Sequence, residues 1–289
     1  MEEEQFAVIG AGTMGHSIAQ LAAMNGYQTR VCDPDRDALD RGRAKIVASL
    51  GKLVEKGRIA SKVAEVAEAQ LVFTTSKAEA LEGAKIVIEA VPEILTLKQE
   101  TFSEVEQFVA SDALLATNTS QLSITSIAAH TKHPERVIGM HFFNPAVIMK
   151  LVEIIQGLKT SEGTLSRAQQ LAGKMGKESV VCRRDTPGFI TTRAIMALRL
   201  ECIRIHEEGI ASIEDIDKAL RLAFNHPMGQ FELNDMNGLD VALLGSRNLR
   251  DAYGERFAPP TSLVSRCAAG DLGRKSGRGW YVYDEQLPR

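Results

Sequence analysis

Phe6-Ala-Val-Ile-Gly-Ala-Gly-Thr-Met-Gly15 joins a short apolar run to three glycines spaced as GxGxxG. The apolar run predicts a buried strand, and the residues that follow predict a helix through Gly26. In such a turn the first glycine permits a tight bend, the second lets a pyrophosphate approach the backbone, and the third lets helix and strand pack closely. The helix N-terminus would then face the phosphates. The motif favours a dinucleotide-binding turn; a glycine-rich turn of purely structural use is the alternative.

An acidic residue stands where the second strand ends. Residues 27–32 predict this strand, and Asp33 follows it, 18 residues after Gly15. A carboxylate at that place accepts hydrogen bonds from the ribose hydroxyls and repels a 2′-phosphate, so the sequence predicts NAD rather than NADP. Arg36 follows three residues further on. It either argues against NAD in favour of NADP, or is an exposed charge on a helix surface.

Strand and helix signals alternate over the first two thirds of the chain. Strands are predicted at residues 71–75, 85–89, 113–117, 137–141, 151–155 and 179–182, and helices at 96–110, 123–130 and 164–175. This alternation predicts a mostly parallel sheet with helices on both faces. The charged residues 35–70, with a break near residues 56–58, predict a helical hairpin that projects from the sheet.

The strand signals stop near residue 184, and only helical patterns follow. These patterns lie near residues 189–209, 212–223, 229–236, 238–252 and 261–269. The sequence therefore predicts an α/β Rossmann-type NAD-binding domain over residues 1–185, with its hairpin near residues 35–70. An all-α C-terminal domain is predicted over residues 186–289.

The composition is that of a globular protein in a reducing compartment. Of the 289 residues, 44% are hydrophobic and 25% are charged, and a net charge of −3 gives no electrostatic reason to expect nucleic acid as a partner. The four cysteines are widely spaced, without a CxxC or a Cys/His cluster, so we expect free thiols and no metal site. Residues 1–5 are acidic and do not form a signal peptide, and no apolar run is long enough to span a bilayer. We therefore expect a cytoplasmic location and no membrane partner.

Two polar residues interrupt the apolar strands predicted within residues 137–155. His141 ends the first of these strands, and Glu153 lies inside the second. A carboxylate that faces an imidazole fixes its tautomer and stabilises its protonated form, which suits a general base near neutral pH. Spacing alone leaves the alternative of a core histidine beside an unrelated glutamate.

A series of ordered motifs carries a family resemblance over nearly the whole chain. They are Gly10-Ala-Gly-Thr-Met-Gly15, Ile88-Glu-Ala-Val-Pro-Glu93, Asn118-Thr-Ser-Gln-Leu-Ser123, His141-Phe-Phe-Asn-Pro145, Leu151-Val-Glu153, Asp185-Thr-Pro-Gly-Phe-Ile190, His226-Pro-Met-Gly229, Gly238-Leu-Asp240 and Lys275-Ser-Gly-Arg-Gly-Trp280. With them the chain resembles the L-3-hydroxyacyl-CoA dehydrogenases, in particular the short monofunctional 3-hydroxybutyryl-CoA dehydrogenase type. The resemblance implies a Rossmann domain, a helical domain that forms a homodimer, and reversible NAD-linked oxidation of a short 3-hydroxyacyl-CoA to a 3-ketoacyl-CoA.

The resemblance also implies catalytic roles. His141 matches the family's base and Glu153 the carboxylate that orients it. Ser120 is implied beside the substrate oxygens, where its hydroxyl would donate to the developing carbonyl; its alternative role is the N-cap of the helix at 123–130. Thr192 stands where the family usually has an asparagine, and it keeps one hydroxyl but is shorter and branched. This departure leaves the substrate less defined than the cofactor.

The remaining implied contacts fall into two sets. Those for NAD are Gly10, Gly12, Thr13, Met14, Gly15, Asp33, Glu93, Lys98 and Asn118, and those for the coenzyme A substrate are Ser49, Lys52, Lys56 and Asn144. Glu93 and Lys98 are implied near the nicotinamide ribose, with a solvated helix start as the alternative. The two hairpin lysines either pair with phosphates as point charges or form an ordinary charged helix face. Asn144 equally suits a turn before a proline.

Two other functions stay open on the sequence. The first is a dehydrogenase of the same superfamily for a non-CoA hydroxy acid, of the gulonate dehydrogenase type. Lys52 and Lys56 distinguish this function from that of an enzyme with a CoA substrate. Their replacement should raise the Michaelis constant for CoA substrates only if they bind CoA. The second is a non-catalytic NAD-binding protein that kept the fold, because fold does not fix function. The presence of Ser120, His141 and Glu153 together argues against this second reading.

Overall fold

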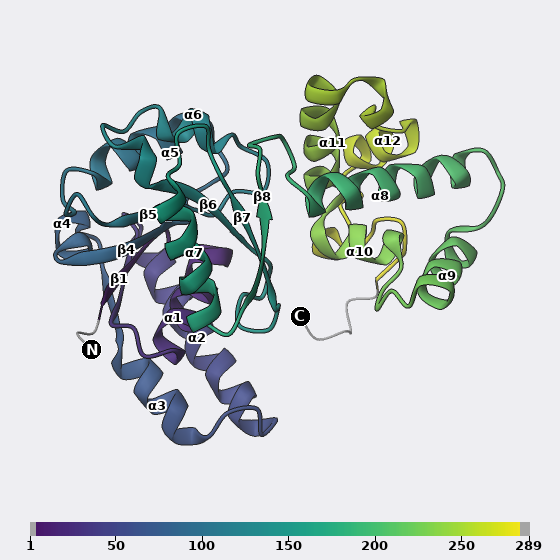
Figure 1. The fold of residues 1–289 in the computed structure, drawn as a ribbon. Helices are drawn as coiled ribbons and strands as arrows, with labels where there is room; N and C mark the ends of the chain where they lie inside the picture. The colour runs from purple at the N-terminus through teal and green to yellow at the C-terminus, as the bar shows by residue number, and fades with distance from the viewer. Residues whose placement is uncertain (1–3, 284–289) are drawn as a thin grey trace. The chain divides into compact units, whose positions relative to one another are not determined.

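The chain divides into two compact units, residues 1–186 and residues 187–289. The computed structural model describes residues 4–283 of the chain. Strands alternate with helices in the first unit, and the second is helical, as the colours of Figure 1 show along the chain. The predicted fold class, an α/β Rossmann-type domain followed by an all-α domain, is confirmed.

An eight-stranded sheet forms the centre of the first unit, in the order β3-β2-β1-β4-β5-β6-β7-β8. The strands are β1 (Gln5–Ile9), β2 (Thr29–Cys32), β3 (Leu71–Thr74), β4 (Ala84–Glu89), β5 (Leu114–Thr117), β6 (Val137–Phe142), β7 (Leu151–Ile155) and β8 (Glu178–Cys182). Neighbouring strands are parallel except β6 and β7, which run antiparallel. Val8 and Ile88 have no exposed surface, as expected for central strands that are covered on both faces.

Polar caps and glycine turns set the limits of the helices in this unit. They are α1 (Thr13–Met24), α2 (Arg36–Glu55), α3 (Ser61–Ala69), α4 (Lys77–Leu81), α5 (Leu95–Val105), α6 (Ile124–Ala128) and α7 (Glu162–Lys174). Asp35 begins α2 by accepting a hydrogen bond from the backbone N of Asp37, and Ser161 begins α7 in the same way. Helix α4 was not predicted, since five residues are too few for a helical period. Helix α5 ends five residues before the predicted limit.

Helices α2 and α3 form the hairpin between β2 and β3. They lie side by side and extend beyond one end of the sheet (Figure 1). The buried residues Leu39, Ile46 and Leu50 follow a helical spacing along α2, so one face of this helix packs on the core while the opposite face carries charges. Gly57 has a φ of +64°, which ends α2 and lets the chain reverse.

The strand order reverses between β1 and β4. The chain runs outward from β1 through β2 to β3, and then returns to place β4 on the other side of β1. In doubly wound sheets the crevice outside the carboxyl ends of the strands at such a point is where ligands bind. The loops after β1, β4 and β5 all begin at this edge, and they carry the glycine turn, Glu93 and Ser120.

The second unit is a helical bundle. Its helices are α8 (Thr191–Glu207), α9 (Ile213–Phe224), α10 (Gln230–Asn237), α11 (Leu239–Tyr253) and α12 (Thr261–Ala269). Phe231 and Trp280 pack edge to face in its core, with ring centroids 5.0 Å apart. Two buried aspartates link parts of the chain that are distant in sequence. Asp217 in α9 accepts a hydrogen bond from the backbone N of Phe231 in α10, and Asp235 in α10 accepts one from the backbone N of Trp280. Within residues 4–283, no helix is long and apolar enough to cross a membrane.

Candidate active site

The glycine turn after β1 has the geometry of a phosphate cradle. Gly10 has a φ of +104°, and a Cβ there would lie 2.7 Å from the carbonyl oxygen of Ala90. A Cβ at Gly15 would lie 1.8 Å from the oxygen of Gly10, so helix α1 passes too close for any side chain. A Cβ at Gly12 would meet no described atom within 4 Å. The two outer glycines are thus required by packing, while Gly12 faces open space at the N-terminus of α1, where Thr13 and Met14 present uncapped N–H groups.

Asp33 ties the end of β2 to this turn. Its Oδ2 accepts a hydrogen bond from the backbone N of Ala11 at 2.9 Å, and its Oδ1 accepts from the N of Asp35 at 3.0 Å. The carboxylate is half-buried, whereas Arg36 lies exposed at the start of α2. A negative charge is therefore held beside the glycine turn, where it suits ribose hydroxyls and opposes a 2′-phosphate.

His141 and Glu153 face each other across the antiparallel pair β6 and β7. They are direct partners in the strand register, and Nδ1 of His141 lies 2.8 Å from Oε2 of Glu153. Glu153 has no exposed surface, and His141 is 8% exposed. Because a carboxylate can only accept, the imidazole proton sits on Nδ1, and Nε2 is the nitrogen that can take a further proton. The register makes the two residues partners, so the alternative that Glu153 is unrelated to His141 is wrong. The catalytic role of the pair stays a prediction.

Ser120 lies in a loop that follows β5, and Glu93 holds that loop. Oε1 of Glu93 accepts hydrogen bonds from Thr119 Oγ1 at 2.6 Å, Ser120 N at 2.9 Å and Ser120 Oγ at 3.3 Å. The alternative that Ser120 caps α6 is wrong, because Ser123 does so by accepting from Ser126 N. The Ser120 hydroxyl is half-buried rather than engaged in a helix cap.

Asn118 links the same loop to the His141 strand. Its Oδ1 accepts a hydrogen bond from the backbone N of Phe142 at 2.9 Å. This bond fixes the end of β6 against the end of β5, one residue from His141. The structure thus brings the predicted residues Glu93, Asn118 and Ser120 together at the carboxyl edge of the sheet.

Lys98 is buried, which excludes the alternative of a solvated helix start. Its side chain has no exposed surface, and its Nζ lies 2.7 Å from Oε1 of Glu89 and 3.6 Å from Oε2 of Glu93. Burial raises the pKa of Glu89, although Lys98 and hydrogen bonds from Thr117 and Val91 act in the opposite direction. Of the two carboxylates beside Lys98, Glu93 is the one that reaches the surface, since its side chain is 37% exposed.

A cavity of about 440 Å³ lies between helix α2 and the loop after β6. The predicted residues Ser49, Lys52 and Lys56 line it, together with Lys45 and Arg58, which were not predicted. Among residues 4–283, four cations and no carboxylate line this cavity. Lys45 precedes Ser49 by four residues and Lys52 by seven, so its helical spacing was the signal that it shares their face.

Apolar side chains close the other wall of the same cavity. Pro145, Val147 and Ile148 line it, and they follow Asn144 after β6. Asn144 itself is exposed at the corner of this loop. Thr192 is the second residue of α8 in the second unit, where it is half-buried. Its contact with substrate stays a prediction.

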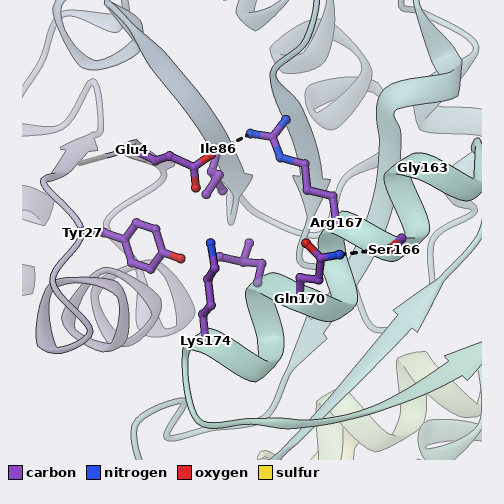
Figure 2. A pocket seen from close by; sticks show the side chains of 9 residues that line it. Glu4, Tyr27, Ile86, Gly163, Ser166, Arg167, Gln170 and Lys174 are labelled. Atoms are coloured by element: carbon purple, nitrogen blue, oxygen red, sulfur yellow. Dashed lines mark hydrogen bonds and ion pairs between the residues drawn. The ribbon is translucent and has the colours of Figure 1, made fainter. Parts of the chain in front are cut away.

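A second cavity, of about 340 Å³, lies near the amino ends of the strands (Figure 2). Arg167 there binds Glu4 and donates to the backbone oxygens of Lys85 and Asp112, so both terminal nitrogens of its guanidinium already have partners within the protein. The Tyr27 hydroxyl and the Lys174 ammonium point toward each other in this cavity (Figure 2). This cavity lies at the end of the sheet opposite the glycine turn and His141, so it is not part of the candidate active site.

Comparison with known proteins places the chain in a family. The NAD-binding domain of 3-hydroxyacyl-CoA dehydrogenase matches residues 5–186, and the C-terminal domain of that family matches residues 188–283. The chain is 42% identical over 288 residues to a probable 3-hydroxybutyryl-CoA dehydrogenase of Bacillus subtilis, covering 99% of both chains. It is 38% identical over 283 residues to the 3-hydroxybutyryl-CoA dehydrogenase of Mycobacterium tuberculosis, covering 97% of this chain and 98% of that one.

A solved structure gives the same result for the fold. The (S)-3-hydroxybutyryl-CoA dehydrogenase of Ralstonia eutropha matches with a TM-score of 0.93 and 36% identity, over 98% of this chain and all of that one. The resemblance that the motifs indicated is therefore confirmed by the family models, the relatives and the solved structure. The chain belongs to the 3-hydroxyacyl-CoA dehydrogenase family.

Proposed function

We propose that this protein is an NAD-dependent L-3-hydroxyacyl-CoA dehydrogenase that interconverts short-chain 3-hydroxyacyl-CoA and 3-ketoacyl-CoA. The observation that carries the proposal is the buried pair of His141 and Glu153, 2.8 Å apart, on the sheet that also carries the glycine turn. Family membership and the names of the relatives point to the same chemistry.

Acid–base chemistry at His141 fits this reaction. A hydride can leave C3 of the substrate only as the hydroxyl proton is removed, and the neutral imidazole takes that proton at Nε2. The charge that develops on the ring is balanced by Glu153, which faces Nδ1 at 2.8 Å. In the reverse direction the imidazolium returns the proton to the carbonyl oxygen. The Ser120 hydroxyl is proposed to donate to the same oxygen as charge develops on it.

The residues around the glycine turn fit NAD. Gly12 leaves open space beside the first N–H groups of α1, and Asp33 holds a negative charge at the end of β2. When bound there, NAD supplies the hydride acceptor. The chain's own contribution is to hold the pyrophosphate at the helix N-terminus and to disfavour a 2′-phosphate through Asp33.

The charged cavity on α2 supports a coenzyme A substrate. Lys45, Lys52, Lys56 and Arg58 give it a strongly positive lining, while Ile148 and its neighbours supply apolar contact for the rest of the ligand. Several phosphates on one ligand are what such a lining fits best. A small hydroxy acid without phosphates would leave these four cations without a role, which favours the CoA substrate over the gulonate type.

A homodimer in the cytoplasm completes the proposal. Apolar side chains are exposed on the second unit, among them Leu222 at 76%, Phe224 at 65% and Leu244 at 58%. Large exposed apolar groups mark surfaces of association. The four cysteines are free thiols, which suits a reducing compartment. Light scattering on the purified protein should give twice the chain mass.

A substrate panel tests the proposed function. Purified protein is assayed with 3-hydroxyacyl-CoAs of increasing chain length, with NAD and with NADP, and in reverse with acetoacetyl-CoA and NADH. We expect turnover with short acyl-CoAs and a preference for NAD. Normal NADH binding without turnover of any hydroxyacyl-CoA would show that the substrate assignment is wrong.

A further inference from the structure

A buried ion pair lies where β4 meets helix α5. Nζ of Lys98, in the first turn of α5, lies 2.7 Å from Oε1 of Glu89, the last residue of β4, and the two side chains are 0% and 1% exposed. Glu89 also accepts from Thr117 Oγ1 at 2.6 Å, on the neighbouring strand, and from the backbone N of Val91 at 2.6 Å. Both oxygens of Glu89 are therefore used, and Lys98 is the cation that balances them.

The ammonium of Lys98 is enclosed by protein oxygen atoms. Besides Glu89, it faces the carbonyl oxygens of Val91 at 3.2 Å and Asn118 at 3.4 Å, and Oε2 of Glu93 at 3.6 Å. An ammonium has three protons to donate. Four surrounding oxygens and complete burial leave Lys98 no proton to offer a cofactor or substrate.

Glu93 connects this buried pair to the Ser120 loop (residues 118–121). One of its oxygens faces Lys98, and the other accepts from the backbone N–H groups of Ser120 at 2.9 Å and Gln121 at 3.3 Å, as well as from Thr119 Oγ1 at 2.6 Å. Glu93 is the exposed member of the cluster: the loop holds its Oε1, and the Lys98 ammonium lies 3.6 Å from its Oε2. Without that cation the carboxylate would keep its bonds to the loop but lose its tie to the buried pair.

We propose that Lys98 and Glu89 are positioning residues for Ser120: the buried pair fixes Glu93, and Glu93 fixes the loop that presents the Ser120 hydroxyl. The inference rests on the proposed function for the role of Ser120 in the reaction. Stability alone is a weak reason to bury such a pair, since apolar residues of similar volume usually serve as well or better. A fixed charge behind Glu93 is what apolar residues cannot supply.

Replacement of Lys98 by methionine removes the charge and keeps the length of the side chain. Burial raises the pKa of Glu89, and loss of Lys98 removes a contribution that lowers it, so the variant favours the neutral form of this carboxyl more than the wild type does. The double variant Glu89→Gln/Lys98→Met removes both charges and serves where the single variant does not fold. In either variant Glu93 loses its cation, and the Ser120 loop loosens.

Kinetic coupling distinguishes a positioning role from a general structural one. We expect Lys98→Met to lower kcat by about 10- to 100-fold, the range for a lost charge-assisted hydrogen bond, while the Kd for NADH changes less than about twofold. Since Lys98 acts through Ser120, adding Lys98→Met to Ser120→Ala should cost no further kcat. Losses that multiply in the double variant would overturn the proposal.

Amide hydrogen exchange gives a readout that needs no activity. Lys98→Met should speed exchange at the amides of Ser120 and Gln121 by about tenfold. Arg136→Met is the matched control, because Arg136 pairs with Glu106 at the other end of α5, with side chains 8% and 7% exposed at 3.2 Å. The control should leave the Ser120 loop protected.

Unchanged exchange at Ser120 and Gln121 in both Lys98 variants, or an equal effect of Arg136→Met, would overturn the proposed positioning. A wild-type protein that binds NADH but turns over no acyl-CoA would instead overturn the proposed function. The exchange comparison would still decide whether Lys98 holds the loop, so the two failures are distinguishable.

Discussion

Glu153→Gln removes one charge from the acid–base pair and little else. The carboxylate has no exposed surface, and its Oε2 lies 2.8 Å from Nδ1 of His141. A charge-assisted hydrogen bond of this kind contributes about 1.5–3 kcal/mol, which corresponds to about 10- to 100-fold in rate. The amide can also donate to Nδ1, which would favour the tautomer with its proton on Nε2 and remove the base. We therefore expect kcat to fall by at least about tenfold, both for oxidation of the hydroxyacyl-CoA and for reduction of the ketoacyl-CoA.

The assay is the absorbance of NADH at saturating acetoacetyl-CoA, with NADH affinity measured separately. Glu178→Gln is the matched control, since Glu178 begins the neighbouring strand β8 and is exposed. The control should keep the wild-type kcat. The reasoning is refuted if Glu153→Gln retains kcat within about twofold, or if NADH affinity falls as much as kcat, which would indicate a general loss of structure.

Three further predictions concern the ligand sites. Asp33→Ala should reduce the preference for NAD over NADP by about tenfold or more in kcat/KM, and an unchanged ratio would remove Asp33 from cofactor selection. Replacing Lys52 and Lys56 by alanine should raise KM for acetoacetyl-CoA and leave KM for the matching pantetheine thioester unchanged; an equal rise for both would contradict phosphate binding. Gly15→Ala should lower the free energy of unfolding by about 3 kcal/mol or more, because its Cβ would lie 1.8 Å from the oxygen of Gly10. A denaturant titration measures this free energy, and a variant as stable as the wild type would contradict the close packing.

The sheet was predictable because most of its strands are short, largely apolar runs bounded by glycine, proline or polar residues. The glycine turn is the clearest example, since close backbone contacts require Gly10 and Gly15, while Gly12 faces open space. Helix α4 escaped prediction, because one helical turn and a half shows no period. The early end of α5 at Val105 escaped it too, since residues 106–110 are compatible with helix but turn toward β5 instead.

The site was predictable only where partners lie in register or along one helix face. His141 and Glu153 ended up opposite each other because β6 and β7 pair antiparallel, a pairing that spacing alone did not determine. Lys45 was missed although its helical spacing shows the same face as Lys52. The burial of Lys98 was not predictable at all, because a lysine is buried only where distant segments supply its partners, here Glu89 and the loop after β5.

The central claim is that His141 is the base of a 3-hydroxyacyl-CoA dehydrogenase. We test it by the turnover of acetoacetyl-CoA and NADH by the wild-type protein and by His141→Gln. NADH binding is measured on both proteins by fluorescence. We predict wild-type turnover and a loss of about 10²- to 10⁴-fold in His141→Gln with NADH binding retained, since the base contributes a factor of that size. A wild-type protein that binds NADH without turnover, or a His141→Gln variant with full activity, would contradict the account.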